Sequence, residues 1–556
     1  MIGKFPQRYY PLLLAGLGIL FYFPFLGHVH LFDWDEINFA ESAREMLVTG
    51  NYTRVQIDFQ PFWEKPPLFF WLQAAAMHVF GIGEFAARFP NAVMGVITLV
   101  TLFYMGRSLI DVRFGLVWAL GYLGSVAPHF YFKTGIIDPT FNYFIFVGIW
   151  LLFRRNFLLS GLLIGLAVLT KGPVGALLAG LTFGSFWVIN RFRPLLTWRD
   201  ALVWVGCVAG VTSLWFGPEI LLNGPWFLQE FITYQIRLFS TPDAGHEQPF
   251  YYHFVVVLVG CFPMSILAIR YLVLPANPTA NRPGGQPLRP IDAQTAGQTD
   301  NSTAEQIFLR WMVCLFWVVL ILFSVVRTKI VHYSSLAWFP VSYLAAYHLY
   351  LLLTGVVRWS RWFTVGLLAV GGLLGLILTA LPLAGMNARA IMPYIEDPFV
   401  VGNLQASVQW AGWEWGISAA WLVALLLCAT LVRRVGFRAV VGLYGATAVM
   451  LWVYSAVVVP KIEQYVQGAV IAFYESKRGQ AVIVEPIGYK SYAHLFYFQK
   501  QPPADPRTHD ENFLLNGPLT KPTFLITKID RADDYRKHPN LILVKEENGF
   551  VFFRRR

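Results

Sequence analysis

The sequence predicts an all-α membrane protein that crosses the bilayer many times and carries a small soluble α/β domain at its C-terminal end. Of its 556 residues, 56% are hydrophobic and 17% aromatic, whereas only 13% are charged. Apolar runs of spanning length recur over residues 10–458, which is typical of a polytopic membrane protein. The residues after them alternate short apolar and polar stretches, which indicates strands and a helix outside the membrane.

The apolar runs predict about thirteen transmembrane helices. The first extends from Tyr10 to Leu26 and follows a short basic segment with Lys4 and Arg8. It lacks a small-residue cleavage site, so we expect an uncleaved signal anchor with a cytoplasmic N-terminus. The other runs lie near residues 85–106, 113–128, 137–153, 157–171, 173–191, 200–217, 252–270, 307–326, 331–353, 363–383, 412–432 and 436–458.

The apolar stretch from Leu68 to Phe80 is too short to cross a bilayer comfortably. If it lies at the interface, arginine pairs such as Arg433 and Arg434 fall in cytoplasmic loops, and most acidic residues fall on the opposite side. This asymmetry is the one that the positive-inside rule describes. We therefore expect residues 28–84 to form an outer loop with juxtamembrane helices.

The rest of the chain divides into two further parts. Residues 274–306 are rich in Pro, Gly, Gln and Ala, and we expect them to form a disordered cytoplasmic loop. Residues 1–459 then form the transmembrane domain, and residues 460–556 an outer α/β domain. Within that domain, EQYVQGAVIAFYESKRG predicts a helix, and QAVIVE, PTFLITKI, LILVKE and GFVFFRRR predict strands.

Composition and motifs argue against several classes of function. The net charge of +11 comes largely from basic residues in short loops between apolar runs, where topology explains it, so no nucleic-acid partner is expected. The sequence has no Gly-rich phosphate loop and no Gly-x-Ser-x-Gly motif, which argues against a nucleotide cofactor and serine esterase chemistry. The four cysteines lie in apolar runs without CxxC spacing and are expected to be small core residues: Cys207, Cys261, Cys314 and Cys428.

Residues 28–67 concentrate carboxylates between the first two membrane runs. Asp33 is placed to cap a helix in a capping box with Glu36, and Gly50 to end that helix. Apolar residues recur at helical spacing, so we expect a helix on the membrane surface with Asp35 in its first turn. Each acid alone is typical of a solvated charge or a cap, but a carboxylate beside a membrane span needs a partner that offsets its desolvation.

Other charged residues converge on the same outer face. Acids with Arg and Lys around one aqueous cavity suit a substrate with phosphates and a polar head, although each basic residue alone is typical of an interfacial anchor. Glu64 and His246 are candidates to share a divalent ion, zinc or magnesium, but no close spacing such as HExxH supports the pair. The remaining candidates are Arg54, Lys65, Asp138 in KTGIIDPTFN, Lys171 in LTKGPVG, and Arg327, Lys329, His332 and Tyr333 in RTKIVHYSS.

Six motifs, taken in chain order, resemble a known family: DWDEINFAESAREM, KPPLFFWL, FAARFPNAVMG, IIDPT, LTKGP and RTKIVHYSSLAWFP. Their order is similar to that of the membrane glycosyltransferases of the GT-C class, in the branch that contains the protein O-mannosyltransferases. Within this branch the chain most resembles the bacterial lipid A aminoarabinose transferases. The resemblance covers essentially all of the expected spans and implies a GT-C fold.

The resemblance implies an inverting transfer of 4-amino-4-deoxy-L-arabinose from undecaprenyl phosphate to a lipid A phosphate, a modification linked to resistance to cationic peptides. The reaction would take place on the periplasmic side of the bacterial inner membrane, in a monomer whose partners are the lipid-linked donor, lipid A and membrane lipids. By motif, Asp35 and Asp138 take the places of the two catalytic acids. Phosphate or sugar would be bound by Arg54, Lys65, Glu36, Lys171, Arg327, Lys329 and Tyr333.

The nature of the acceptor decides the role of Asp35. A phosphate is already anionic and needs no strong base, so Asp35 would orient the donor, the amino sugar or a metal and stabilise oxocarbenium-like charge. With a protein hydroxyl as acceptor, Asp35 would act as the base. Two alternatives stay open: transfer of another sugar, such as mannose, to a protein or glycolipid, and a lipid-linked sugar flippase, although transporters typically carry charge near mid-membrane.

Overall fold

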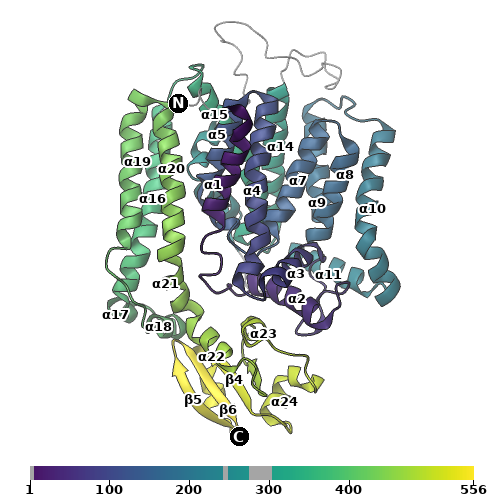
Figure 1. The fold of residues 1–556 in the computed structure, drawn as a ribbon, viewed down its shortest axis with the longest axis vertical. Coiled ribbons are helices and arrows are strands. Elements are labelled where there is room, and N and C mark those ends of the chain that lie inside the picture. The colour runs from purple at the N-terminus through teal and green to yellow at the C-terminus, as the bar shows by residue number, and fades with distance from the viewer. Residues whose placement is uncertain (1–5, 242–247, 274–303) are drawn as a thin grey trace.

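The computed structural model describes residues 6–241, 248–273 and 304–556. Long helices run side by side in one bundle, and the C-terminal part of the chain forms a separate layer at one end of it (Figure 1). The N-terminal end lies at the opposite end of the molecule. The expected disordered loop at 274–306 falls outside the described residues, except that its last three residues begin a helix.

The predicted apolar runs correspond to helices. Seven helical segments among the described residues are long and apolar enough to cross a membrane, and shorter apolar helices pack among them. The number of about thirteen crossings stays a prediction. The helices of the bundle are α1 (Tyr10–Tyr22), α4 (Glu84–Leu109), α5 (Val112–Leu123), α6 (Val126–Tyr131), α7 (Asp138–Phe153), α8 (Phe157–Lys171), α9 (Val174–Ile189), α10 (Trp198–Asn223), α12 (Tyr252–Gly260), α13 (Met264–Val273), α14 (Ala304–Val325), α15 (Trp338–Leu353), α16 (Arg361–Met386), α19 (Trp415–Val435) and α20 (Phe437–Val457).

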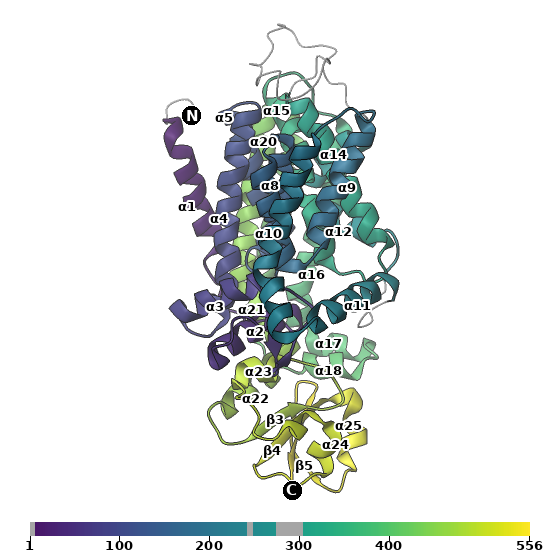
Figure 2. The same cartoon turned by 90° about the vertical axis from the view of Figure 1, so that its right-hand side faces the viewer.

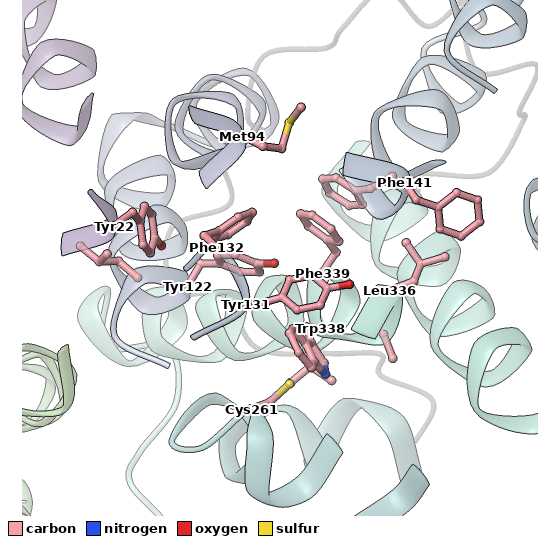
Figure 3. Packing of buried hydrophobic residues seen from close by; sticks show 14 of the residues in the cluster. Tyr22, Met94, Tyr122, Tyr131, Phe132, Phe141, Cys261, Leu336, Trp338 and Phe339 are labelled. Carbon is pink, nitrogen blue, oxygen red and sulfur yellow. The ribbon is translucent and has the colours of Figure 1, made fainter. Parts of the chain in front are cut away.

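Aromatic side chains fill the bundle where α1, α5, α7 and α15 meet (Figure 3). Phe339 stacks on Phe146 with 4.2 Å between ring centroids and on Tyr122 at 5.3 Å. Tyr22 packs against Phe132 at 5.1 Å. Each such pair contributes about 0.5–1.5 kcal/mol beyond burial, so this core fixes the ends of the helices that carry the loops described below.

Three helices lie at the end of the bundle that faces the C-terminal domain: α2 (Asp35–Thr49), α3 (Leu68–Phe80) and α11 (Trp226–Ser240) (Figures 1 and 2). Helix α3 has the bounds of the expected juxtamembrane helix. Between α2 and α3 the chain forms a short hairpin of β1 (Gln56–Ile57) and β2 (Gln60–Pro61).

Helix α2 differs from its prediction in two ways. Every residue from Glu36 to Met46 is buried, because the helix lies between the bundle and the C-terminal domain rather than on an open membrane surface. The predicted capping box is also wrong: the N-cap residue is Trp34, without a side-chain cap, and the Asp33 carboxylate instead accepts a hydrogen bond from Ser491. The predicted end is confirmed, since Gly50 adopts a left-handed conformation with φ of 69°.

The C-terminal domain contains a four-stranded sheet in the order β3-β4-β6-β5. Strands β3 and β4 are parallel, and the other two pairs are antiparallel. Strands β4 and β6 fall within the segments expected from the sequence, and β3 and β5 each extend one residue beyond theirs. The elements of this part of the chain are α21 (Val459–Glu463), the π-helical segment Gln464–Gly468, α22 (Ala469–Lys477), β3 (Ile483–Pro486), α23 (Ala493–Phe498), α24 (Glu511–Asn516), β4 (Thr523–Lys528), α25 (Ala532–Arg536), β5 (Leu541–Glu547) and β6 (Phe550–Arg555). Two short helices, α17 (Ala388–Ile391) and α18 (Pro398–Leu404), lie earlier in the chain, between α16 and α19.

The close approach of α4 and α5 yields a prediction about stability. A Cβ on Gly115 would lie 2.4 Å from the carbonyl oxygen of Phe103, and the obstacle is backbone that cannot rotate away. Gly115→Ala should lower the free energy of unfolding by about 1–3 kcal/mol, measured by thermal unfolding in detergent. Gly206→Ala in α10 is the matched control, since nothing lies within 4 Å of its added Cβ. Equal melting temperatures for the two variants would contradict this packing.

Candidate active site

A cavity of about 580 Å³ lies where the bundle, α2 and the C-terminal domain meet. A second cavity, of about 350 Å³, lies within the C-terminal domain and contains neither Asp35 nor Asp138. The first cavity therefore holds the candidate chemistry. Its wall includes Asp33, Trp34, Asp35, Glu36, Glu64, Lys65, Asp138, Lys171, Tyr234, Arg237, His332, Tyr333, Lys490 and Tyr492.

Helix ends position the charged groups of this cavity. Asp35 and Asp138 lie in the first turns of α2 and α7, and Lys171 is the last residue of α8. The helix dipole favours negative charge at a helix N-terminus and positive charge at a C-terminus, so each group lies where its own helix stabilises it.

The acids and bases alternate across the cavity. Lys171 Nζ donates a hydrogen bond to Asp138 Oδ1 at 2.5 Å. His332 Nε2 lies 3.2 Å from Asp35 Oδ2 and 3.9 Å from Asp138 Oδ2. His332 therefore lies between the two carboxylates, where a protonated imidazole reduces their mutual repulsion.

The cations keep Asp35 ionised. Burial acts to raise the pKa of the Asp35 carboxyl, but the hydrogen bond and charge of His332, with the charges of Lys65 and Lys171, outweigh it and lower the pKa to about 2. Burial lowers the pKa of the Lys65 ammonium, and the nearby Glu64 carboxylate opposes this shift. At neutral pH, Asp35 is thus a carboxylate that opens into the cavity with a side-chain exposed fraction of 40%.

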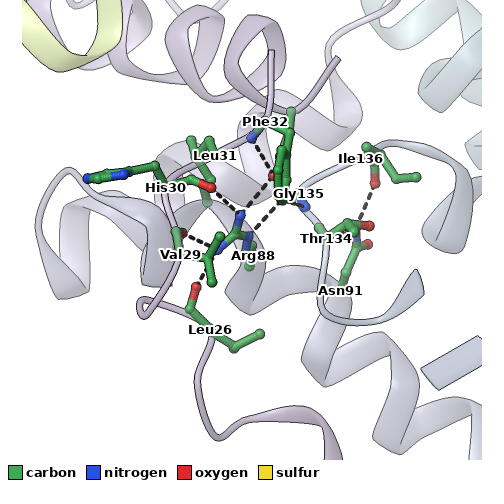
Figure 4. A network of polar contacts seen from close by, with 12 residues as sticks. Leu26, Val29, His30, Leu31, Phe32, Arg88, Asn91, Thr134, Gly135 and Ile136 are labelled. Carbon is green, nitrogen blue, oxygen red and sulfur yellow. Dashed lines mark hydrogen bonds and ion pairs between the residues drawn. The ribbon is translucent and has the colours of Figure 1, made fainter. Parts of the chain in front are cut away.

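Helix α4 holds both acidic loops through two buried polar residues (Figure 4). Arg88 donates hydrogen bonds to both carboxylate oxygens of Glu36, at 2.7 and 2.8 Å. The same guanidinium donates to the carbonyls of Leu26, Val29 and His30 at 2.7, 2.6 and 3.0 Å. The loop before Asp35 is therefore wrapped around one side chain.

The second loop is tied to the same helix. Asn91 Nδ2 donates hydrogen bonds to the carbonyls of Thr134 and Ile136, at 2.7 and 2.6 Å. Between them, the Gly135 amide donates to Glu36 Oε1 at 2.6 Å. The segment that leads into Asp138 is thus fixed relative to the segment that leads into Asp35.

The C-terminal domain secures the first loop from the other side. The Leu31 amide donates to the Tyr497 hydroxyl at 2.6 Å, and the Leu31 carbonyl accepts from Gln467 Nε2 at 2.9 Å. The Asp33 carboxylate accepts from Ser491 Oγ at 2.5 Å. The acidic loop therefore lies between α4 and the C-terminal domain.

The structure brings together most of the residues singled out from the sequence. Asp35, Asp138, Glu36, Glu64, Lys65, Lys171 and Tyr333 line the cavity. Arg54, Arg327 and Lys329 do not; the Arg54 guanidinium lies over the ring of Trp226 at 5.8 Å, and Lys329 is buried between two residues of the wall, Thr328 and Ile330. Glu36 lines the wall, but its oxygens are occupied by Arg88 and by the amides of Phe32 and Gly135.

Of the two residues expected to share a metal ion, Glu64 lines the cavity and His246 lies outside the described residues. In the part of the chain that the structure describes, one group of three residues offers ligands at metal-binding separation: Asp58, Glu485 and His494. Lys500 Nζ already lies 2.7 Å from Asp58 and 2.5 Å from Glu485. Because the ammonium supplies the cation, this group fits an ion-pair network that joins the β1–β2 hairpin to the C-terminal domain.

Sequence reasoning gave no role to five residues of the wall. His332 was a candidate of the outer face in RTKIVHYSS but was given no function, although a histidine between two acidic loops is a signal for proton or charge chemistry. Tyr234 and Arg237 lie on α11, whose amphipathic pattern was passed over. Lys490 and Tyr492 carry no local signal, because their position depends on how the C-terminal domain packs.

Known proteins that resemble this chain are membrane glycosyltransferases. Residues 64–216 match a family model described as dolichyl-phosphate-mannose-protein mannosyltransferase. An undecaprenyl phosphate-alpha-4-amino-4-deoxy-L-arabinose arabinosyl transferase of Pseudomonas aeruginosa is 26% identical over 471 residues, 77% of this chain and 77% of the relative. The enzyme of the same name from Edwardsiella ictaluri is 27% identical over 279 residues, 45% of this chain and 47% of the relative. The chain thus spans between about half and three quarters of the length of these relatives.

Solved structures share the whole fold. ArnT from Cupriavidus metallidurans bound to undecaprenyl phosphate superposes with a TM-score of 0.74 and 17% identity, covering 99% of this chain and 98% of that one. The apo form gives a TM-score of 0.73 and 16% identity. The fold class and the resemblance expected from the sequence are both confirmed.

The buried pair of Arg88 and Glu36 yields a second prediction. Arg88→Met removes the guanidinium and leaves Glu36 as an uncompensated buried charge, so the free energy of unfolding should fall by about 3–5 kcal/mol in a detergent melt. The double variant Arg88→Met, Glu36→Gln removes that charge and should recover part of the loss. A single variant as stable as wild type would show that water replaces the pair.

Proposed function

We propose that this chain is an inverting glycosyltransferase that moves 4-amino-4-deoxy-L-arabinose from undecaprenyl phosphate to a phosphate of lipid A, at the periplasmic face of the bacterial inner membrane. The observation that carries the proposal is the cavity in which Asp35 and Asp138 meet Lys65, Lys171 and Arg237 at one end of a membrane bundle. The similarity to aminoarabinose transferases supports the choice of sugar.

The cations of the cavity suit a lipid-linked donor. Lys65 precedes α3, Lys171 ends the bundle helix α8 and Arg237 lies on α11, so all three lie at the end of the bundle that carries the cavity. A prenyl chain can stay in the bilayer while its phosphate reaches these groups. Lysine and arginine bind phosphate through charge-assisted hydrogen bonds.

Asp35 suits the positive charge of the transition state. As the bond between the sugar and the donor phosphate weakens, positive charge develops at the anomeric carbon, and an ionised carboxylate nearby stabilises it. The same carboxylate attracts the protonated amine of the sugar. Asp138 is paired with Lys171, so its role in this proposal is to hold the cation that faces the donor phosphate.

The proposed transfer of the sugar needs no general base, because the acceptor phosphate is already anionic. A phosphate oxygen of the acceptor forms the new bond to the anomeric carbon while the bond to the donor phosphate oxygen breaks. Undecaprenyl phosphate leaves as an anion beside the cations of the cavity. A divalent ion held by Glu64 and His246 and a monomeric protein are further parts of the proposal. Chelator treatment followed by addition of zinc or magnesium tests the ion.

The family match favours one second candidate, transfer of mannose to a protein hydroxyl. A neutral hydroxyl needs a base, and a carboxylate whose pKa lies at about 2 is a weak one. The electrostatics of Asp35 therefore support the phosphate acceptor. A flippase is less well supported, because the clustered charges lie at one end of the bundle.

Transfer in membranes tests the proposal directly. Purified lipid A and an extract with polyprenyl-phosphate aminoarabinose should give lipid A with one added aminoarabinose mass in mass spectrometry. Asp35→Asn should lower the amount of this product by a factor of about 10²–10³ at unchanged protein level, as expected for an electrostatic group at the reacting carbon. Asp138→Asn should lose less. No added mass with wild type would refute the sugar or the acceptor, and full activity in both variants would refute the assigned roles.

The contact between His332 and Asp35 yields a pH prediction. In wild type the lowered pKa keeps Asp35 ionised across the working range. His332→Ala removes a hydrogen bond and a charge that oppose burial, so the pKa of Asp35 rises and the active carboxylate is lost as the pH falls. The ratio of variant to wild-type transfer rates, measured from pH 8 to pH 5, should decrease toward acid, by about tenfold per pH unit below the new pKa. Parallel profiles would contradict the role of His332.

A further inference from the structure

The C-terminal domain supplies two residues to the wall of the cavity, Lys490 and Tyr492. They lie in the segment between β3 and α23. Tyr492 is buried, with an exposed fraction of 8%, whereas the Lys490 side chain is exposed. The soluble domain thus takes part in the candidate active site and does not merely cover it.

The segment that carries Lys490 is fixed to the acidic loop. Ser491 Oγ and the Tyr492 amide both donate hydrogen bonds to the Asp33 carboxylate, at 2.5 and 3.3 Å. The Trp34 ring packs edge-on against the Tyr492 ring, with centroids 5.6 Å apart. Lys490 is therefore held next to residues that immediately precede Asp35.

The charge of Lys490 is not neutralised within the described residues. Its Nζ lies over the rings of Trp34 and Tyr492, at 5.2 and 5.3 Å from the centroids, and no carboxylate of the described chain pairs with it. Lys171 by contrast is paired with Asp138. Aromatic faces orient an ammonium but leave its charge and its N–H donors available, so Lys490 can bind an anion in the cavity.

We propose that Lys490 binds a phosphate of the acceptor and thereby makes the C-terminal domain select a phosphorylated acceptor. This inference rests on the proposed function. Inversion requires the attacking oxygen to approach the sugar from the face opposite the leaving phosphate. The donor phosphate is assigned to cations on the membrane side, so the acceptor phosphate belongs on the side of the C-terminal domain, where Lys490 is the cation of the wall.

Binding measurements test the inference without need of catalysis. The purified full chain in nanodiscs is titrated with bisphosphorylated lipid A and, separately, with dephosphorylated lipid A. Lys490→Gln should weaken binding of the bisphosphorylated lipid by about five- to tenfold, because one charge-assisted contact is lost. It should leave binding of the dephosphorylated lipid and the Kd for the donor unchanged. Lys537→Gln, an exposed lysine of the same domain outside the cavity, is the matched control and should change none of these values.

The outcomes separate the two proposals. If wild type prefers the bisphosphorylated lipid and Lys490→Gln keeps that preference in full, the role of Lys490 is refuted while the proposed acceptor stands. If wild type shows no preference between the two lipids, the proposed acceptor is refuted as well. Lys490→Gln could also weaken binding of both lipids equally at an unchanged melting temperature. That result would show that the lysine shapes the cavity without recognising phosphate, and it would also refute the inference.

Discussion

The buried ion pair between Arg88 and Glu36 holds in place the loop on which the candidate site depends. Desolvating two charges costs several kcal/mol, and the cost is offset only when the remaining donors and acceptors are satisfied. Here all five guanidinium N–H groups are used, two on Glu36 and three on backbone carbonyls of the loop. The pair therefore acts as a fixed centre around which the chain before Asp35 is wrapped.

A second constraint acts within the cavity, where two carboxylates lie close together beside an apolar bundle. The order Asp35, His332, Asp138, Lys171 alternates potential negative and positive charge along contacts of 3.2, 3.9 and 2.5 Å. Each acid thus faces a base, and repulsion between the acids is reduced without covering the open side of Asp35. The arrangement leaves one carboxylate facing the cavity and the other occupied in orienting a cation.

Local features of the fold followed from the sequence, because short-range periodicity determines them. Helix α3, the left-handed Gly50 and the four strands of the C-terminal domain were all predictable in this way. The hydrogen-bond partner of Asp33 could not be predicted. The local sequence favours a capping box at that residue, but in the structure its carboxylate accepts a hydrogen bond from Ser491, which lies far along the chain. The burial of α2 was missed for the same reason, since no local pattern reveals that a distant domain covers it.

The site residues also divide into those that local motifs reveal and those that depend on distant packing. Asp35, Asp138, Lys65 and Lys171 belong to short motifs in loops between spans, and topology alone places them on one face. Arg54, Arg327 and Lys329 were expected on that face but do not line the cavity, because lining depends on side-chain packing rather than on topology. Lys490 could be found only once the domain was seen to contact the acidic loop.

The contact between Leu31 and Tyr497 joins residues separated by 466 positions. At about 5–20 residues per second, a ribosome needs roughly half a minute to a minute and a half to make the second partner after the first. During that interval the loop has its membrane-side anchor on α4 but lacks Gln467, Ser491 and Tyr497. Assembly of the site is therefore a late event in biogenesis, and chains truncated before the C-terminal domain present quality-control proteases with an acidic loop secured on one side only.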